Sequence, residues 1–394
     1  MYPNAIFIIS DLFCSDHDKG LRLTKSEREN QMKKIIVCFD GTGNEPEDAH
    51  QKKIEGGSLE DSNISNVLKL HLLAGGSLDN SSAIVDGQHS LYFSGVGTRG
   101  SFFRRILRQA FALRSPQIIM NEALRDLEKI CDKEDRLYVY GFSRGAAIAR
   151  KFASLLAREG LQTKQGMPDP HPVIEMLGVW DTVASFGAPN LDSRNRPLSD
   201  VVFENGTVST IVRNAYHLLS LDENRLAFRP TLMNAQDKIS EIWFSGVHSD
   251  IGGGYLRSGL SDITLEFMKE KSLLHGLHFL DIADIPDKTL RGVDQDGDRI
   301  TIDREDIESR PDHRAVIHKH SESWRDGILK DMTTAARDLV VMKNDLPSER
   351  LPIIHHTVSD RMRDIKEYRP YSLDGEAYHI LTKNGEIKQQ PVLG

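Results

Sequence analysis

The chain has 394 residues, of which 39% are hydrophobic and 7% aromatic, a composition normal for a globular protein. Its formal net charge of −8 argues against a general nucleic-acid binder, because such proteins usually neutralise many phosphates with a basic face. No apolar run approaches the length needed to cross a bilayer, so any contact with a membrane would have to be peripheral and local.

The cysteines and the first residues indicate the compartment and the start of the folded domain. Cys14, Cys38 and Cys131 are few, odd in number and widely separated, which predicts neither a disulfide framework nor a thiolate metal site and fits a reducing cytoplasm. Residues 1–31 have no basic segment before their apolar run and no clear cleavage site after it, so we expect no signal peptide. We expect a poorly ordered extension over 1–31 and one domain over 32–394.

The first half of that domain alternates between strand and helix. Residues 33–40 (KKIIVCFD) are a continuous apolar run that predicts a strand buried on both faces. Helical spacing of apolar residues follows over 63–73, a second strand is predicted over 90–96, and a helix over 118–130. This alternation favours a doubly wound, mostly parallel sheet with helices on both faces.

Residues 136–150 (RLYVYGFSRGAAIAR) carry the most informative motif. A β-branched and aromatic strand runs into the pattern G-x-S-x-G and then into an alanine-rich helix, as in the nucleophile elbow of α/β hydrolases. The two glycines allow a turn so tight that the hydroxyl of Ser143 is left exposed at its tip. An ordinary strand-turn-helix connection is the alternative reading of this pattern.

Two further strands are predicted over 173–181 and 239–247. We expect a long helical insertion between them and a helical, charged C-terminal region over 256–394, which leaves a catalytic core at about 33–255. The carboxyl ends of parallel strands meet at one edge of a sheet. The residues expected to converge at that edge are Asp40, Gly95, Ser143, Asp181 and His248.

The expected chemistry follows from the order of these residues. A serine hydroxyl needs an imidazole to take its proton, and the imidazole needs a carboxylate to fix its tautomer. In this class the order is serine, acid, histidine, which predicts Ser143, Asp181 and His248. Asp250 is a second candidate for the acid. The competing bases are His355 and His356, which also suit the order.

Acyl transfer also needs hydrogen-bond donors for the oxyanion. The amide of Arg144, directly after the nucleophile, is the first candidate, and the turn at Gly41 and Thr42 supplies the second. That turn follows Asp40 in the sequence FDGTG, which is similar to the D-x-D-G-T loop of haloacid-dehalogenase-type phosphatases. Cys38 stands where their nucleophilic aspartate would be, so that chemistry is not expected here; Asp40 could hold the Ser143 turn or bind a cation.

Two other segments have alternative interpretations. Residues 294–305 (DQDGDRITIDRE) place acids at calcium-loop positions, but Arg299 replaces the glycine of the sharp turn, which favours an acidic hairpin or loop. Residues 102–114 (FFRRILRQAFALR) predict a basic amphipathic helix. Such a helix can lie on an anionic membrane surface, although more often it packs on its own domain.

Six segments in this order, KKIIVCFDGTGN, SGVGTRG, GFSRGAAIAR, GVWDTV, LDENRLAFRPT and WFSGVHSDIGGGY, resemble one family. It is the uncharacterised α/β-hydrolase domain family that includes the type VI secretion phospholipase effectors of the first lipase class. The resemblance covers about 33–255, with a weaker echo at 354–361. It implies Ser143 as nucleophile, Asp181 as acid, His248 as base, and acyl esters of membrane phospholipids as substrates.

The resemblance also has a departure. The family's effectors usually carry additional membrane-anchoring segments, whereas this chain has little beyond the catalytic domain. We expect a cytoplasmic protein, which the resemblance makes a candidate for delivery as a secreted effector without a signal peptide.

The sequence thus predicts a serine esterase acting on phospholipids or other lipids, with no organic cofactor required and no metal indicated. Three alternatives remain. A metal-dependent phosphatase or phosphodiesterase would use Asp40, Asp181 and Asp250. A related hydrolase would act on a soluble ester, and a non-catalytic module would keep the fold without turnover.

Overall fold

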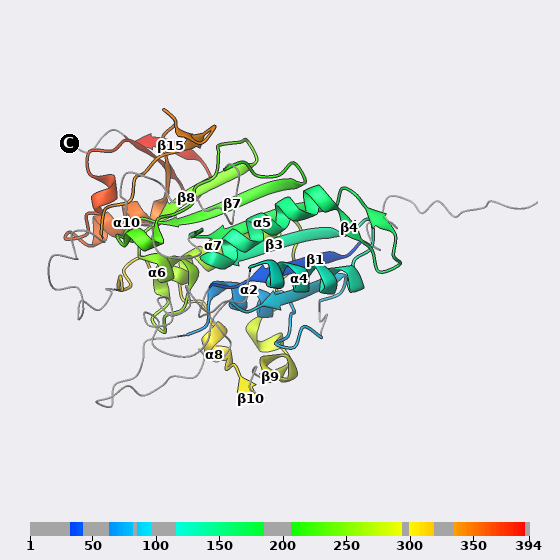
Figure 1. Cartoon of the computed structure of the whole chain (residues 1–394). Helices are drawn as coiled ribbons and strands as arrows, with labels where there is room; N and C mark the ends of the chain where they lie inside the picture. The colour runs from blue at the N-terminus through cyan, green and yellow to red at the C-terminus, as the bar shows by residue number, and fades with distance from the viewer. Residues whose placement is uncertain are drawn as a thin grey trace, which may run out of the picture.

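The computed structural model describes residues 32–41, 63–81, 85–95, 116–184, 206–293, 299–318 and 334–390. A nine-stranded sheet in the order β15-β14-β13-β8-β7-β6-β3-β1-β2 runs through the molecule (Figure 1). Every neighbouring pair is parallel except β14 and β15. Its strands are β1 Lys34–Phe39, β2 Gln88–Phe93, β3 Arg136–Phe142, β6 Val173–Trp180, β7 Val212–Ser220, β8 Ile239–Phe244, β13 Ile353–His355, β14 Tyr378–Leu381 and β15 Ile387–Gln390.

Helices and three small hairpins surround this sheet. The α-helices are α2 Asn66–Leu73, α4 Pro116–Ile130, α5 Arg144–Glu159, α6 His248–Gly252, α7 Gly259–Leu274, α8 Arg304–Ile307 and α10 His356–Asp364. Short 3-10 helices are Leu226–Phe228, Ile282–Asp284, Asp287–Leu290 and Tyr371–Leu373. The hairpins pair β4 Leu161–Gln162 with β5 Pro168–Asp169, β9 Arg291–Val293 with β10 Arg299–Thr301, and β11 Met342–Lys343 with β12 Leu346–Pro347. No helix in the described ranges is both long and apolar enough to span a membrane.

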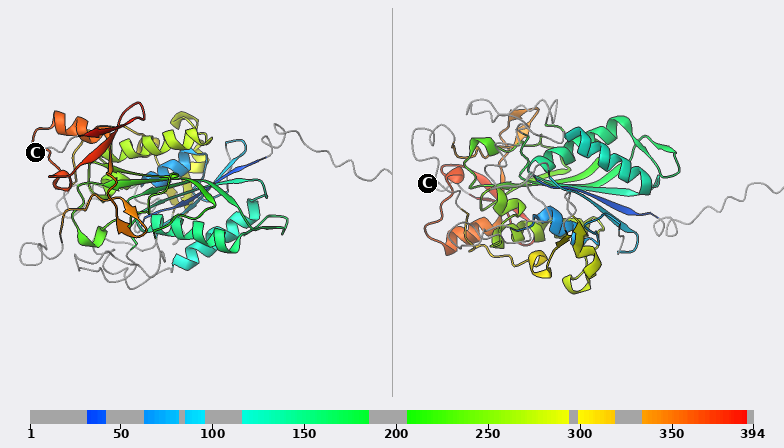
Figure 2. Two further views of the ribbon diagram at one scale, coloured as in Figure 1. Left: turned by 90° about the horizontal axis from the view of Figure 1, so that it is seen from above. Right: turned by 60° about the horizontal axis from the view of Figure 1, so that its bottom comes forward.

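Strand β1 shows why helices cover both faces of the sheet. Successive side chains of a strand point to opposite faces. Ile36 and Cys38 are buried in one hydrophobic cluster with residues of α2 and α7, whereas Ile35 and Val37 are buried in another with residues of α4 and α5. Seen from above, the sheet lies between these two helical layers (Figure 2). The predicted doubly wound, mostly parallel sheet is confirmed.

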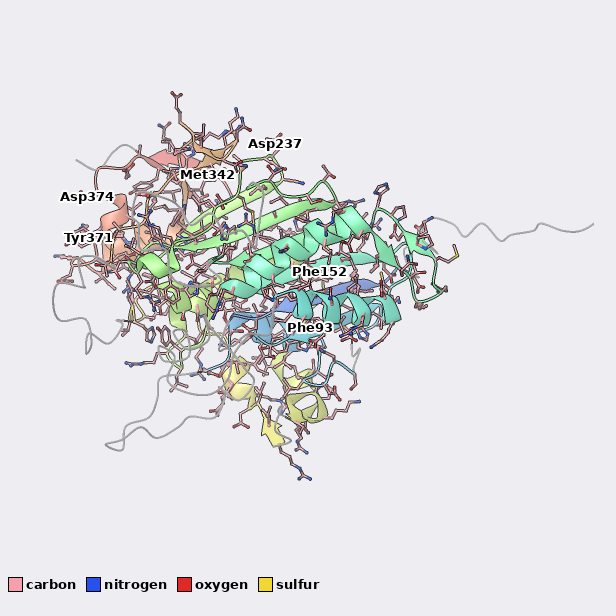
Figure 3. All side chains as sticks on the ribbon, viewed as in Figure 1. Phe93, Phe152, Asp237, Met342, Tyr371 and Asp374 are labelled. Carbon is pink, nitrogen blue, oxygen red and sulfur yellow. The ribbon has the colours of Figure 1, made fainter. Side chains whose placement is uncertain are left out.

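A third hydrophobic cluster lies under the C-terminal strands. Leu219 and Trp243, from β7 and β8, pack there with Ile354 of β13 and Ile380 of β14. The core of the other half is aromatic, because Phe39 contacts both Phe93 and Phe152 with ring centroids 5.6 and 5.3 Å apart. Figure 3 shows Phe93 and Phe152 in the half of the molecule opposite to the exposed Tyr371.

The order of the strands reverses at β1, and this places the site. Strand β2 pairs with one edge of β1 and β3 with the other, and α2 and α5 follow β1 and β3 on opposite faces. In open α/β sheets the binding crevice lies beyond the carboxyl ends of the strands at such a switch point. The registers align those ends, with Phe39 opposite Phe93 and Gly141, and Phe142 opposite Trp180.

The strands predicted from continuous apolar runs are present as β1, β2, β3, β6 and β8. The region between Asp181 and β8 differs from the expected helical insertion, because its described part contains strand β7 and one short 3-10 helix. The region after residue 256 is mixed, and β13, β14 and β15 extend the main sheet. These strands are short or interrupted by polar residues, so the sequence lacks the apolar runs that identify the others.

Several predicted features lie outside the described residues. They are the extension over 1–31, Thr42, the basic helix over 102–114, residues 185–205 and residues 294–298 of the calcium-like loop. The remainder of that loop belongs to the β9–β10 hairpin and to α8, where the Asp303 amide donates to Asp306 Oδ2 at 3.1 Å. The described part therefore matches the hairpin interpretation.

Candidate active site

Ser143 sits in a strained turn between β3 and α5. Its φ of 57° and ψ of −122° lie in a region that non-glycine residues rarely adopt. Both glycines of the motif are needed for close approach: a Cβ on Gly141 would lie 2.5 Å from the Gly145 carbonyl oxygen, and one on Gly145 would lie 2.3 Å from the carbonyl oxygen of Asp40. The tight turn at Ser143 therefore follows from the backbone packing of β3 and α5 against β1.

Asp181 follows β6, the strand next to β3, and its turn is tied to the Ser143 turn. Its φ of 40° is also left-handed, and its amide donates to the carbonyl oxygen of Leu218 at 2.7 Å. Two residues later, the Val183 amide donates to the carbonyl oxygen of Ser143 at 3.1 Å. These contacts hold the two turns side by side at the carboxyl edge of the sheet.

A buried histidine, His217, holds the backbone of the turn after Asp181. His217 Nε2 accepts a hydrogen bond from the Thr182 amide at 3.1 Å, and its Nδ1 lies 2.7 Å from Glu241 Oε1. The acceptor role of Nε2 fixes the proton on Nδ1, which donates to the carboxylate. His217 thus uses both ring nitrogens to hold the backbone after Asp181.

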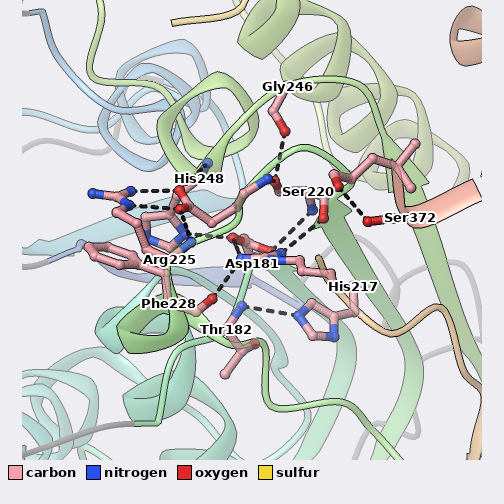
Figure 4. A network of polar contacts seen from close by, with 12 residues as sticks. Asp181, Thr182, His217, Ser220, Arg225, Phe228, Gly246, His248 and Ser372 are labelled. Atoms are coloured by element: carbon pink, nitrogen blue, oxygen red, sulfur yellow. Dashed lines mark hydrogen bonds and ion pairs between the residues drawn. The ribbon is translucent and has the colours of Figure 1, made fainter. Parts of the chain in front are cut away.

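His248 begins α6 and turns its ring toward Asp181 (Figure 4). Its Nδ1 lies 2.6 Å from Asp181 Oδ2, and both side chains are buried. The ring packs against Phe142, the residue before Ser143, with centroids 4.7 Å apart, and against the edge of Phe228 at 4.9 Å. His248 Nε2 is buried and has no hydrogen-bond partner among the described residues.

The carboxylate of Asp181 is fully engaged. Arg337 donates to Oδ1 from Nη1 at 2.5 Å and to Oδ2 from Nη2 at 2.9 Å, and the Ser220 amide donates to Oδ1 at 3.1 Å. Together with His248, these donors account for about four acceptor positions of a carboxylate. Sequence reasoning missed Arg337, because nothing in the pattern around it distinguishes it from other arginines.

Burial and charge act in opposite directions on this pair. Burial alone would raise the pKa of Asp181, but the charge of Arg337 and the hydrogen bond from His248 outweigh it and hold that pKa below its usual range. Burial lowers the pKa of His248 below its ordinary value, although the Asp181 carboxylate and Glu223 oppose this shift. The arrangement is therefore an ionised aspartate beside a neutral imidazole at neutral pH.

Residues 221–231 (LDENRLAFRPT) pack beside His248. Arg225 donates to both carboxylate oxygens of Glu223, from Nε at 2.7 Å and from Nη2 at 2.6 Å, and lies over the Phe228 ring at 3.6 Å. Glu223 Oε2 in turn accepts from the His248 amide at 3.3 Å. The motif thus fixes both the backbone and one face of the histidine.

The predicted oxyanion donors are only partly described. Arg144 is the first residue of α5, so its amide has no acceptor within the helix and comes directly after Ser143. The Gly41 amide donates to Asp40 Oδ1 at 2.6 Å, which means that this amide is already engaged. Thr42 lies outside the described residues.

Asp40 joins the end of β1 to its surroundings. Its Oδ2 accepts from Ser65 Oγ at 2.5 Å and from the Tyr92 hydroxyl at 2.7 Å. Ser65 is the N-cap of α2 and accepts from the Leu68 amide. The sequence left two roles for Asp40, to hold the Ser143 turn or to bind a cation. These contacts and the close approach of Gly145 to the Asp40 backbone favour the first role.

Asp250, the second candidate for the acid, is bound to partners other than the His248 ring. Its Oδ2 accepts from the Val247 amide at 3.0 Å, and its Oδ1 lies 2.6 Å from Nδ1 of His318. His318 is stacked on Tyr255 with ring centroids 3.8 Å apart. Asp250 therefore orients a different histidine and closes the first turn of α6.

His355 and His356, the competing bases, lie at β13 and α10. His355 stacks on Phe244 at 4.6 Å, and its Nδ1 lies 2.8 Å from Thr357 Oγ1. Burial, together with the nearby His356, lowers the pKa of His355 to about 3. His356 Nδ1 lies 3.0 Å from Asp360 Oδ2. His355 also packs against Phe267 and His356. The histidine bound to Asp181 is His248.

The three carboxylates considered for a metal site have separate partners. Asp40 binds hydroxyl groups, Asp181 binds Arg337, and Asp250 binds His318. In the part of the chain that the structure describes, no group of three or more His, Cys, Asp or Glu residues is arranged to hold a metal ion. Cys38 and Cys131 are buried and free.

Comparison with known proteins finds distant relatives. The chain is 27% identical over 275 residues to an uncharacterized protein of Saccharomyces cerevisiae, YEL023C, covering 56% of this chain and 36% of that protein. An uncharacterized protein from Pseudomonas aeruginosa has 22% identity, a TM-score of 0.41, and coverage of 64% of this chain and 47% of its own. The Tle1 effector bound to the VgrG spike of the type 6 secretion system has 22% identity, a TM-score of 0.38, and coverage of 58% and 52%.

The chain thus spans about half, or less, of the length of these relatives. A family model matches a larger share of it. The model describes the catalytic domain of Tle1-like type VI secretion phospholipase effectors and matches residues 33–171 and 162–271. These segments include Ser143, Asp181 and His248 and cover more than half of the chain. The chain belongs to the family of Tle1-like phospholipase effector catalytic domains, and its fold is of the α/β-hydrolase class.

Proposed function

We propose that this protein is a serine hydrolase of carboxylic esters, with Ser143 as nucleophile, His248 as general base and Asp181 as the acid. The observation that carries the proposal is the 2.6 Å contact of His248 Nδ1 with Asp181, which leaves the buried Nε2 without a partner among the described residues. Ser143 follows Phe142, whose ring packs on this imidazole, and its left-handed backbone fits a nucleophile elbow. A serine, an imidazole and a carboxylate that meet in this order are what acyl transfer requires.

In this mechanism His248 Nε2 takes the proton of Ser143 as Oγ attacks the ester carbonyl. The Arg144 amide donates to the oxyanion. The Gly41 amide, the second predicted donor, would have to release Asp40 Oδ1 to join it. The alcohol leaves with the proton from His248, and Ser143 remains acylated. Water then gives a proton to His248 and attacks the acyl group. His248 passes that proton to Ser143 Oγ as the bond between Oγ and the acyl group breaks, which releases the acid and restores Ser143.

The favoured substrates are phospholipids or other lipid esters. Membership of a phospholipase effector family supports this class. A soluble ester is the second candidate, because the family match identifies the domain and does not by itself identify its substrate. The metal-dependent phosphatase is disfavoured by the separate partners of Asp40, Asp181 and Asp250.

A fluorophosphonate probe tests the catalytic residues. We expect covalent labelling of Ser143, seen by peptide mass spectrometry, and loss of labelling in Ser143→Ala and His248→Ala. His355→Ala and His356→Ala are the matched controls and should label like the parent. Labelling that persists in His248→Ala but disappears in either control would assign the base to the other site.

A panel of esters tests the substrate class. Hydrolysis is measured from short-chain nitrophenyl esters to phospholipid vesicles, with the Ser143→Ala protein as blank. Preference for vesicles supports a lipid hydrolase, and preference for short soluble esters supports the second candidate. Absence of turnover and of Ser143 labelling in the parent would favour the non-catalytic module.

A further inference from the structure

Arg337 reaches the site from a part of the chain beyond the family match. It lies on an extended segment in which the Ala335 amide donates to the Asn224 carbonyl oxygen at 2.8 Å and Thr334 forms a β-bridge with Arg225. Two residues after Arg337, Leu339 is buried in the third hydrophobic cluster. The segment is therefore anchored on both sides of Arg337, which is itself 5% exposed.

We propose that Arg337 is a positioning residue of the hydrolase site, which fixes the orientation of the Asp181 carboxylate and limits how readily His248 takes a proton. This inference rests on the proposed function. Arg337 acts through Asp181 and is not expected to touch the substrate.

The geometry supports the orienting role. The planar guanidinium binds one oxygen of Asp181 with each terminal nitrogen, so the carboxylate cannot rotate without breaking both hydrogen bonds. The same two nitrogens donate to the carbonyl oxygens of Ser220, at 3.0 Å, and Phe228, at 2.7 Å. Arg337 thereby fixes the carboxylate relative to the end of β7 and to the 3-10 helix beside His248.

Without Arg337, the donors left on Asp181 would be the Ser220 amide and His248. The carboxylate would then be buried with no permanent cation beside it. Such a group tends to draw water into the site, and this change misaligns the imidazole.

The charge of Arg337 supports the second role. The charged groups that face His248 are Asp181, from the end of β6, and the Glu223–Arg225 pair, from the loop after β7. Asp250, on the same helix as His248, is bound to His318. Arg337 offsets the negative charge of Asp181, so the imidazolium gains less stabilisation from that carboxylate than it would from an unpaired one.

The test is the pH dependence of kcat/KM for parent and variant proteins on a nitrophenyl ester. In Arg337→Met we expect kcat/KM to fall by about 10- to 100-fold, since small misplacements of reacting groups have effects of that size. We also expect the acidic limb of the pH profile of kcat/KM to shift to higher pH by about one unit, because removing one nearby positive charge makes His248 more basic.

Arg361→Met is the matched control. Arg361 is equally buried, lies in the same C-terminal part, and donates to the carbonyl oxygens of His313 and Ala315, but it has no contact with Asp181. Its loss should lower stability without moving the acidic limb. An Arg337→Met protein whose acidic limb coincides with that of the parent would show that Arg337 is only a structural brace.

Two further variants keep the inference testable if Arg337→Met does not fold. Arg337→Lys retains the charge without the bidentate geometry, so kcat should fall about 10-fold while the acidic limb stays in place. Arg337→Ala should regain activity with added guanidinium ion, and no regain would count against the inference. A parent that is active while these expectations fail overturns only the role of Arg337, whereas a parent that hydrolyses no ester overturns the proposed function and this inference with it.

Discussion

Gly145 shows at the scale of one residue how the tight turn at Ser143 depends on a missing side chain. Helix α5 crosses the end of β1 so closely that a Cβ at Gly145 would lie 2.3 Å from the carbonyl oxygens of both Phe39 and Asp40. Backbone atoms cannot move aside as a flexible side chain can. The position of Ser143 is therefore set by the contact between this glycine and β1.

We expect Gly145→Ala to lower the free energy of unfolding by about 2–4 kcal/mol, because the methyl group forces α5 away from β1. Urea unfolding followed by circular dichroism measures this change. The control is Gly166→Ala, where a methyl group meets no atom within 4 Å and only the positive φ of 72° opposes it, at about 1 kcal/mol. Equal losses in the two variants would contradict the packing argument.

Asp222 is a second residue with a measurable consequence. It accepts from the Gly246 amide at 2.6 Å and from the Tyr368 hydroxyl at 2.8 Å, and burial raises its pKa to about 6. A carboxyl whose pKa is raised by folding contributes stability below its unfolded pKa and loses that contribution as pH rises through the folded pKa. The relevant window here is from about pH 4 to pH 6.

We therefore expect the parent to lose about 1 kcal/mol of stability, relative to Asp222→Asn, between pH 5 and pH 8. Urea unfolding at the two pH values gives the difference. Asp237→Asn, which removes an exposed carboxylate, serves as the control for the loss of one charge. A difference between parent and Asp222→Asn that does not depend on pH would refute the assignment.

At the scale of elements, α2 and α7 are joined by a buried ion pair. Lys69 Nζ lies 3.2 Å from Asp262 Oδ1, and the side chains are 2% and 1% exposed. Asp262 Oδ2 also accepts from Ser258 Oγ at 2.8 Å and from the Arg310 amide at 2.9 Å. The pair lies in the helical layer that covers one face of β1 and β3.

Removing only the lysine should cost more than removing both charges. We expect Lys69→Met to destabilise by about 3–5 kcal/mol, since Asp262 is left buried and uncompensated. The double variant Lys69→Met with Asp262→Asn should recover at least half of that loss, because the amide needs no counter-ion. Thermal unfolding of both proteins decides the point, and an additive double variant would mean that the two side chains do not interact.

The elements that could be predicted from the sequence are those marked by a pattern of neighbouring residues. Strand β3 and the turn into α5 could be predicted from a continuous apolar run followed by two glycines. Strand β7 is not, because Arg213, Asn214 and His217 interrupt its apolar residues, and the partner of His217, Glu241, comes from another strand. Polar residues inside a strand are explained by their contacts with other strands, and these contacts cannot be seen in the local sequence.

The same reasoning separates the parts of the candidate site. Ser143 follows from a five-residue pattern, and Asp181 and His248 follow from the expected order of strand ends. Arg337 lies 156 residues from Asp181 in the sequence, and no local pattern marks that contact. The Gly41 amide was expected to donate to an oxyanion, but in the structure it donates to the side chain of Asp40.

At the scale of the whole molecule, the C-terminal part, residues 334–390, contributes strands to the main sheet. Strand β13 pairs with β8 in parallel, and β14 extends the sheet further. Trp243 of β8 is 1% exposed because this part covers it. The same part carries Arg337 to Asp181, so the stability of the sheet and the geometry of the site depend on one segment.

This dependence predicts the outcome of two truncations. A chain ending at residue 333 lacks β13, β14 and Arg337 and exposes the third hydrophobic cluster, a loss comparable to the roughly 5–15 kcal/mol that stabilises a typical domain. We expect it to be insoluble or to unfold without a cooperative transition in calorimetry. Among the described elements, a chain ending at residue 384 loses β15, an antiparallel edge strand whose residues 387–389 are exposed. We expect this chain to unfold cooperatively and to retain Ser143 labelling. Cooperative unfolding of the shorter chain, with a transition like that of the parent, would show that the first 333 residues fold independently and that the C-terminal strands are an addition to a complete core.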